Sequence, residues 1–228
     1  MYETSRRSLM AALGGAAALS ALARPALALT DEEELVDRAR VTALSMLTSP
    51  NFATLQKMVG HCRAILIFPS VLKGGFIIGA EGGRGLLMAN NDGVWTYPAF
   101  YHLAGASIGL QIGGQVSQVM MTIMHAQALS RILKNNIELG AGASVAVGPI
   151  GKEIGAGSSG DFDADVYTYA ETQGLYAGLN FEGASIGEDQ DRNTYYYGRR
   201  LSAADIVLRN AGANSQAEPL RQAMTAKR

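Results

Sequence analysis

This 228-residue sequence has little cysteine, little charge and no basic excess. Its single cysteine, Cys62, excludes a disulfide within the chain. The formal net charge is -1, and binding along a nucleic-acid backbone needs a basic surface, so no nucleic-acid partner is expected. Hydrophobic residues make up 48% of the chain, which excludes a disordered composition and allows one substantial core.

The first 28 residues have the pattern of a targeting segment. Arg6 and Arg7 precede an apolar run, Leu9 to Ala23, that is short for a membrane span. Ala26-Leu27-Ala28 has the A-x-A form of a cleavage site. Residues 1–28 therefore resemble a twin-arginine export signal, with an uncleaved anchor or another export signal as alternatives. We expect an exported, periplasmic protein, either soluble or peripheral to a membrane.

A glycine-rich pattern recurs in the remaining chain. Gly105-Ala-Ser-Ile-Gly109 returns unchanged at Gly183–Gly187, and a variant lies at Gly142–Gly148. Ile and Val alternate with small residues, which predicts strands with one buried face and one face that another backbone can approach. We expect these strands to face one another at the centre of an α+β fold. The fold class predicted is a curved antiparallel sheet or barrel with packed helices, in a single domain.

Other periodicities predict the remaining elements. Helices are expected at Leu35–Leu47, packed on the sheet, and at Phe52–Val59, Val116–Leu133 and Ser202–Asn210. A hairpin is expected from Phe76–Glu81 and Gly85–Ala89 around Gly82-Gly83-Arg84, followed by a turn at Asn90–Gly93. Further strands are expected near Ile137–Val147, Ala164–Glu171 and Leu175–Ile186. The tail from Gly212 is polar and is expected to be marginally ordered.

Several segments match part of a nucleotide-binding or metal-binding motif but lack the flanking residues or elements that such a site needs. Gly155–Gly160 matches G-x-G-x-x-G but lacks the preceding strand and following helix, and Gly148–Glu153 is not a P-loop. Asp161, Asp163 and Asp165 alternate as in a calcium loop, but the later positions of that loop do not match. These carboxylates are interpreted as solvated, with weak divalent-cation binding as the alternative. The histidines lack ligand spacing, so we expect no metal, no cofactor and no enzymatic activity.

Two clusters have both a structural and a binding interpretation. Met120 and Met124 lie on the predicted helix from Val116, where they either fill the core or form a surface for acyl chains. Tyr195-Tyr196-Tyr197 lies beside Arg192, Arg199 and Arg200. These residues predict either a strand whose tyrosines cap the sheet or a patch for anionic headgroups.

A series of motifs in order resembles the SYLF domain, a lipid-binding domain of actin-patch, endosomal and bacterial envelope proteins. They are Phe68-Pro69-Ser70, Lys73–Phe76, Ile78–Gly82, Trp95 with Pro98–Tyr101, Gly105–Gly113, Leu139–Val145, Val166–Tyr169, Gly174–Gly178, and Glu182-Gly183 to Tyr197-Gly198. The resemblance covers about Leu35 to Leu208. It implies a non-enzymatic protein that binds phospholipid, with the domain at 29–211 and the tail at 212–228.

For an exported chain, the implied partner is anionic phospholipid of the bacterial envelope, and actin is not expected. The candidate headgroup contacts are cations in or beside glycine-rich turns. They are Lys73, Arg84, Lys152, Arg192, Arg199 and Arg200. The first alternative is an envelope stress or structural protein that binds another protein. A hydrolase is the third hypothesis, and it needs a nucleophile, base and acid in one pocket.

Overall fold

The computed structural model describes residues 29–134, 136–148, 163–172, 175–177, 179 and 181–225, without the side chains of 75–78, 107–113 and 175–177. The predicted export signal and residues 149–162 lie outside the described residues. The chain divides into two compact units, and the second begins at Asp31. Every helix and strand within the described ranges belongs to this second unit.

The first helices agree with the sequence pattern. Helix α2 spans Asp31–Thr48, the short 3-10 helix η1 spans Pro50–Phe52, and α3 spans Ala53–Val59. The buried side of α2 includes Val36, Ala43 and Leu47, and this helix packs against β1 as predicted. Apolar positions at helical spacing therefore identified both the helix and its buried face.

Two long strands form the framework of the fold. Strand β1 spans Ala64–Asn91 and β3 spans Ala99–Ile123, and they pair antiparallel from Ala64↔Ile123 to Leu87↔Ala99. We call this pair the β1–β3 ribbon. The short strand β2, Val94–Trp95, pairs back on β1 across Asp92 and Gly93, which have φ of 52° and 90°. Left-handed φ at both residues suits a two-residue hairpin, so the turn predicted at Asn90–Gly93 is confirmed.

The hairpin predicted around Gly82–Arg84 is wrong. Strand β1 continues through these residues, and Gly83 pairs with Leu103 of β3. The glycines allow another part of β1 to pack closely against them and do not form a turn, because a Cβ on Gly85 would lie 2.4 Å from Cδ1 of Phe68. Residues near the two ends of β1 therefore lie against each other.

The contact between Lys73 and Glu81 shows that β1 bends back on itself. Lys73 Nζ lies 3.0 Å from Glu81 Oε2. Eight residues of straight strand would separate the two Cα atoms by about 26 Å. The ribbon therefore turns sharply between these two residues, where β1 also shifts register between Gly75 and Ile77.

The helix predicted from Val116 to Leu133 is wrong in its first half. Strand β3 continues to Ile123, and helix α4 spans only Ala126–Lys134. Val119 and Met121 lie in one core and Met120 lies in the other. A strand buried on both faces is continuously apolar, and such a run also fits the helical spacing.

The other strands extend this sheet, which is antiparallel except for one pair. They are β4 (Ile137–Glu138), β5 (Val145–Val147), β6 (Val166–Thr172), β7 (Leu175–Ala177) and β8 (Ser185–Glu188). Strands β6 and β8 both pair with β3, and β5 pairs with β6 in parallel. The second copy of the repeat therefore pairs with Tyr101–Ala104, directly before the first copy, whereas the first copy pairs with β1 and the β5 copy pairs with β6. The predicted α+β class with a curved sheet is confirmed.

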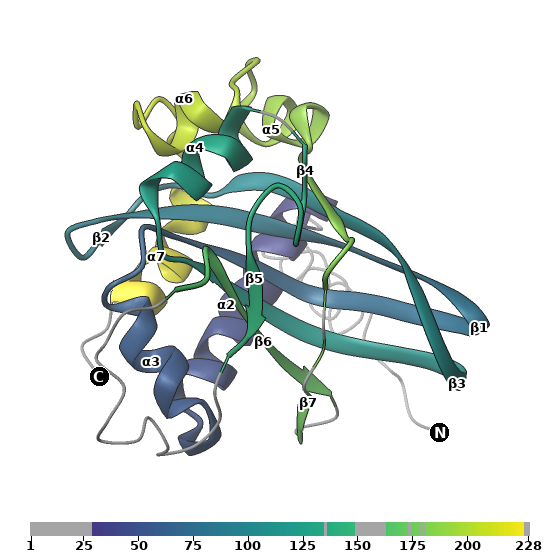
Figure 1. The fold of residues 1–228 in the computed structure, drawn as a ribbon. Helices are drawn as coiled ribbons and strands as arrows, with labels where there is room; N and C mark the ends of the chain where they lie inside the picture. Colours follow the sequence, from purple (N-terminus) through teal and green to yellow (C-terminus); the bar gives the residue numbers. More distant parts are fainter. Residues whose placement is uncertain are drawn as a thin grey trace, which may run out of the picture. The chain divides into compact units, whose positions relative to one another are not determined.

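Helices cover both faces of the sheet (Figure 1). Helix α4 and helix α6, Ala203–Val207, contribute Ile132 and Ile206 to one core with Phe181 of the connecting chain. Helices α2, α3 and α7, the last at Glu218–Thr225, contribute to the second core, which contains Trp95. The sheet thus lies between two helical layers.

Two C-terminal segments differ from the prediction. Tyr195–Tyr197 belong to helix α5, Gln190–Tyr197, which ends at Gly198 with φ of 65°, and not to a strand. The tail forms the 3-10 helix η2, Ser215–Ala217, and then α7, which packs against α2 and buries Leu220 and Met224. The tail is therefore part of the core and not a marginal appendage.

Candidate functional site

The carboxylate of Asp165 has a structural role. Ser144 donates to Asp165 Oδ2 from its backbone nitrogen at 3.0 Å and from Oγ at 3.1 Å. His125 Nδ1 lies 3.2 Å from Asp165 Oδ1. Partial burial acts to raise the pKa of Asp165, but the bonds from Ser144 and His125 outweigh it and hold the pKa below its usual value. Asp165 therefore joins the starts of β5 and β6 to the end of β3, while Asp161 lies outside the described residues.

No metal centre or spanning helix is found in the described part of the chain. Its histidine, cysteine and acidic side chains nowhere form a group of three or more suited to a metal ion. Among the same residues, no helix has both the length and the apolar composition that crossing a membrane requires.

The structure brings two of the predicted cations, Arg84 and Arg192, to one pocket. The pocket has a volume of about 350 Å³ and lies between α2, β1 and α5. We call it the α2–β1 pocket. Its lining residues are Asp31, Glu34, Leu35, Arg38, Pro69, Ser70, Arg84 and Arg192. Three cations and two carboxylates therefore surround one opening.

Arg192 is held by carboxylates within this pocket. Its Nη1 lies 2.6 Å from Glu32 Oε1, its Nε lies 3.4 Å from Asp189 Oδ2, and its Nη2 lies 4.0 Å from Asp31 Oδ2. The side chains of Arg192 and Glu32 are only 16% and 9% exposed. Arg192 thus ties α5 to the first turn of α2, and its guanidinium has little capacity left for a ligand.

Arg84 has a different environment. Its side chain is exposed, and the structure records no hydrogen bond or ion pair for it with any described residue. Arg38 is nearly as available, because it lies 3.9 Å from Glu34 and both side chains are more than half exposed. These two arginines are the cations that a ligand in the α2–β1 pocket could engage.

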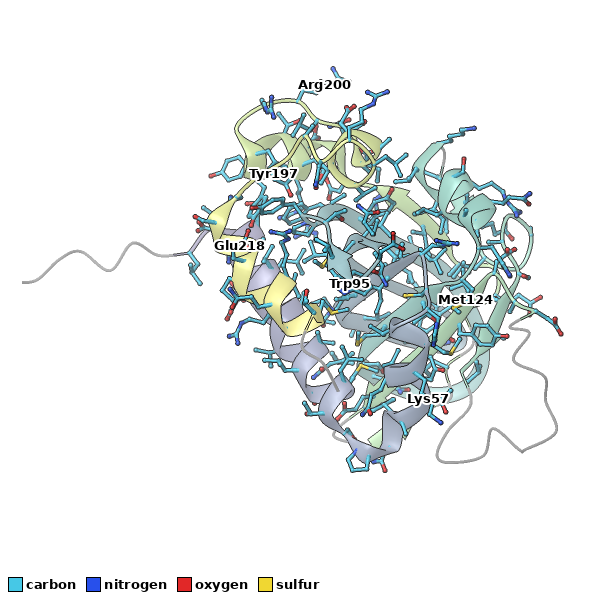
Figure 2. All side chains as sticks on the ribbon, turned by 90° about the vertical axis from the view of Figure 1, so that its left-hand side faces the viewer. Lys57, Trp95, Met124, Tyr197, Arg200 and Glu218 are labelled. Atoms are coloured by element: carbon cyan, nitrogen blue, oxygen red, sulfur yellow. The ribbon has the colours of Figure 1, made fainter. Side chains whose placement is uncertain are left out.

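A second exposed cationic region lies at the corner between α5 and α6. Arg199 donates to the carbonyl of Ala211, and Arg200 is exposed at the outer side of this corner (Figure 2). Tyr195 and Leu208 are 67% and 62% exposed beside them. Of the cluster predicted from the sequence, this corner, residues 195–208, keeps Tyr195, Arg199 and Arg200 exposed, whereas Tyr196 is buried and Arg192 lines the pocket.

Four other candidates lie outside both regions or outside the described residues. Lys73 is paired with the buried Glu81, and Lys152 lies outside the described residues. Met120 is fully buried beneath the α3 layer, and Met124 is only partly exposed and packs on the same core. Met120 therefore offers no surface to an acyl chain.

Sequence reasoning missed an exposed apolar pair on the ribbon. Leu72 and Val116 are cross-strand partners in β1 and β3, and they are 58% and 54% exposed. We call them the Leu72–Val116 pair. The signal in the sequence that could have indicated this apolar surface is a lack of charge, since residues 74–80 and 93–130 contain no Asp, Glu, Lys or Arg. Beyond this pair, the only formally charged residues of the ribbon up to Glu81 are Lys73 and Glu81 themselves, which pair with each other.

Comparison with known proteins identifies the family. A family model described as "Las17-binding protein actin regulator", Ysc84, matches residues 104–227. SH3 domain-containing YSC84-like protein 1 of Homo sapiens is 33% identical over 181 residues, which are 78% of this chain and 53% of that protein. Protein YSC84 of Saccharomyces cerevisiae is 30% identical over 155 residues, which are 66% of this chain and 33% of that protein.

The rat YSC84-like protein 1 is 35% identical over 153 residues, covering 66% of this chain and 45% of the relative. The chain thus spans about half the length of the mammalian relatives that it matches. The family match covers more than half of this chain and agrees with the order of motifs that resembles the SYLF domain. The chain therefore belongs to the Ysc84, or SYLF, family.

Proposed function

We propose that this chain is a non-enzymatic protein that binds phospholipid at the surface of a bacterial envelope membrane. The observation that carries the proposal is the exposed Leu72–Val116 pair on a ribbon whose charges beyond it, Lys73 and Glu81, are paired with each other. Burial of one Val or Leu side chain in an apolar medium contributes about 1.5–3 kcal/mol. Two such side chains on adjacent strands supply a useful part of the free energy of peripheral binding.

The cationic corner supports the same proposal. Arg199 and Arg200 are exposed beside Tyr195 and Leu208, whose apolar parts suit the interface between headgroups and acyl chains. A basic group near an anionic membrane surface contributes about 1 kcal/mol. Exposed cations beside exposed apolar groups support binding to a lipid surface more strongly than either kind of group would alone. The proposal includes an exported, periplasmic location, and the support for that location is the sequence pattern of residues 1–28.

The first test is co-sedimentation of the full 228-residue chain with vesicles of increasing anionic-lipid content, at low and high salt. The variant Val116→Asn is compared with Val94→Asn, because Val94 is 60% exposed but lies in the short strand β2, away from the Leu72–Val116 pair. Both proteins keep the same N-terminal apolar segment, so its own affinity for vesicles cancels. We expect Val116→Asn to weaken binding by about tenfold, and Val94→Asn to bind like the parent chain.

Salt dependence and charge reversal separate the contribution of the cationic corner from that of the Leu72–Val116 pair. If the cationic corner takes part, Arg199→Glu with Arg200→Glu removes the increase in binding with anionic lipid. Equal binding by both valine variants would refute the role of the Leu72–Val116 pair. If the parent chain binds no vesicle of any composition, the lipid proposal fails. The family description, which names Las17 binding, then makes a protein partner the better hypothesis.

A further inference from the structure

We propose that the α2–β1 pocket binds a zwitterionic headgroup that carries both a phosphate and an ammonium, as phosphoethanolamine does. The inference rests on the proposed function, because it names the headgroup class that the membrane surface presents to this chain. The pocket volume of about 350 Å³ falls within the range of about 300–1,000 Å³ that is usual for small-molecule sites.

The phosphate end of the ligand is assigned to Arg84. Its guanidinium has no recorded partner among the described residues, and a planar guanidinium can donate two parallel hydrogen bonds to phosphate oxygens. Arg38 lines the same opening and is only loosely paired with Glu34, at 3.9 Å. Ser70 also lines the pocket and adds a hydroxyl donor.

The ammonium end is assigned to Asp31 and Glu34. Their side chains are 81% and 62% exposed, and their nearest cations lie at 4.0 Å and 3.9 Å, so neither carboxylate is firmly committed. In contrast, Glu32 in the same helical turn is held by Arg192 at 2.6 Å. The structure thus separates a buried ion pair, which fixes the pocket wall, from two carboxylates that remain available.

The mixed charge of the lining decides the ligand class. A purely anionic ligand would gain from Arg84 and Arg38 but would be repelled by Asp31 and Glu34. A zwitterion places opposite charges against both groups, and like-charge contacts are what discriminate against a wrong partner. The lining therefore favours phosphoethanolamine over phosphate alone, although an anionic lipid was the expectation from the sequence.

The position of the pocket suits a lipid source. Pro69 and Ser70 line the pocket, and the exposed Leu72 follows two residues later on the same strand. A ribbon that enters the acyl region beyond the Leu72–Val116 pair would place the pocket among the headgroups. The same chemistry could also reach the pocket as a soluble ester of ethanolamine and phosphate, so the test needs both forms.

The test is a ³¹P NMR titration of the full chain with O-phosphoethanolamine and, separately, with inorganic phosphate. We expect tighter binding of phosphoethanolamine. Arg84→Gln should weaken binding of both ligands by about tenfold, because a hydrogen bond to a charged group contributes about 1.5–3 kcal/mol. The double variant Asp31→Asn with Glu34→Gln should lose the preference for phosphoethanolamine and bind phosphate at least as well as the parent chain. Arg63→Gln is the matched control, since Arg63 is an exposed arginine that does not line the pocket.

In the double variant, phosphoethanolamine should bind more weakly while phosphate binds at least as well, and unfolding of the protein cannot produce this pair of results. Circular dichroism checks folding independently. Equal affinity of the parent chain for both ligands, no binding of either, or no effect of the double variant would overturn the proposal. Vesicles with and without phosphatidylethanolamine then test the lipid source. If the double variant loses its preference for soluble phosphoethanolamine but still prefers phosphatidylethanolamine vesicles as the parent chain does, the headgroup of a lipid is not the ligand of this pocket. The Val116→Asn comparison stays informative in each case, so failure of the pocket and failure of membrane binding are distinguishable.

Discussion

The Lys73 ammonium lies 3.0 Å from the Glu81 carboxylate although both residues belong to strand β1 and seven residues separate them. Glu81 has only 2% of its side chain exposed, and its Oε2 makes no well-directed hydrogen bond. The nearby ammonium is therefore what compensates for the burial of this negative charge. This ion pair joins the two arms of the bent ribbon.

Removal of the cation should destabilise the protein strongly. We expect Lys73→Met to lower the free energy of unfolding by about 3 kcal/mol, because it leaves a buried carboxylate without a partner. Lys73→Met with Glu81→Gln should recover a large part of that loss, since no unpaired charge is then buried. Urea unfolding of the parent chain, the two single variants and the double variant measures the coupling. Additive effects of the two substitutions would contradict the pairing.

The close approach of the two arms gives a second prediction. A Cβ on Gly85 would lie 2.4 Å from Phe68 Cδ1 and 2.6 Å from the backbone oxygen of Ile67. Gly85→Ala should therefore cost about 1–3 kcal/mol through overpacking. Gly114→Ala is the control, because it is a glycine of the same ribbon whose added Cβ would meet nothing within 4 Å. Equal melting temperatures for the two variants would show that the arms do not touch as described.

Asp165 should contribute to stability in a pH-dependent way. The bonds from Ser144 and His125 keep its folded-state pKa below the ordinary value of 3.8. A lowered folded-state pKa means that the stabilisation is present above the unfolded pKa and is lost as the pH falls through the folded pKa. We expect Asp165→Asn to be less stable than the parent chain by about 1–3 kcal/mol at pH 7.

The difference between Asp165→Asn and the parent chain should shrink as the pH falls below about 4. Urea unfolding measured at intervals from neutral to acidic pH follows this change, with Asp163→Asn as a neighbouring control. A difference that stays constant over this range would mean that the ionised carboxylate of Asp165 is not what stabilises its contacts with Ser144 and His125.

Helix α7 should be necessary for stability. Leu220 is fully buried in the core that contains Trp95, and Tyr97 donates to Glu218 Oε1 at 2.5 Å (Figure 2 shows Trp95 and Glu218). We expect Leu220→Ala to cost about 2–5 kcal/mol in unfolding free energy. Gln222→Ala, on the same helix but outside the core, should change it little. Thermal unfolding followed by Trp95 fluorescence distinguishes this result from a loosely attached tail.

The sequence determined the elements whose signals are local. Helical spacing located α2, and Asn-Asp-Gly chemistry located the turn at Asn90–Gly93, because these patterns depend only on neighbouring residues. The order of motifs determined the family. The hydrophobic pattern also required an α+β class with a strand at each glycine-rich repeat, and the structure has strands there.

Only the tertiary structure decided where glycine means a close approach instead of a turn. Gly83 and Gly85 have the local signature of a hairpin, but the backbone of residues 67–71 packs against them. Val116–Ile123 likewise fits either a helix or a strand buried on both faces, and the two covering cores decide between them.

The candidate site divides in the same way. Cations in a sequence are visible, but their partners are not, because ion pairs depend on elements far apart in the chain. Arg192 looked available until Glu32, 160 residues away, was found to hold it, whereas Arg84 remains exposed. Charge composition could thus supply candidates, and only the packing of α2 and α5 against β1 decided which of them a ligand can reach.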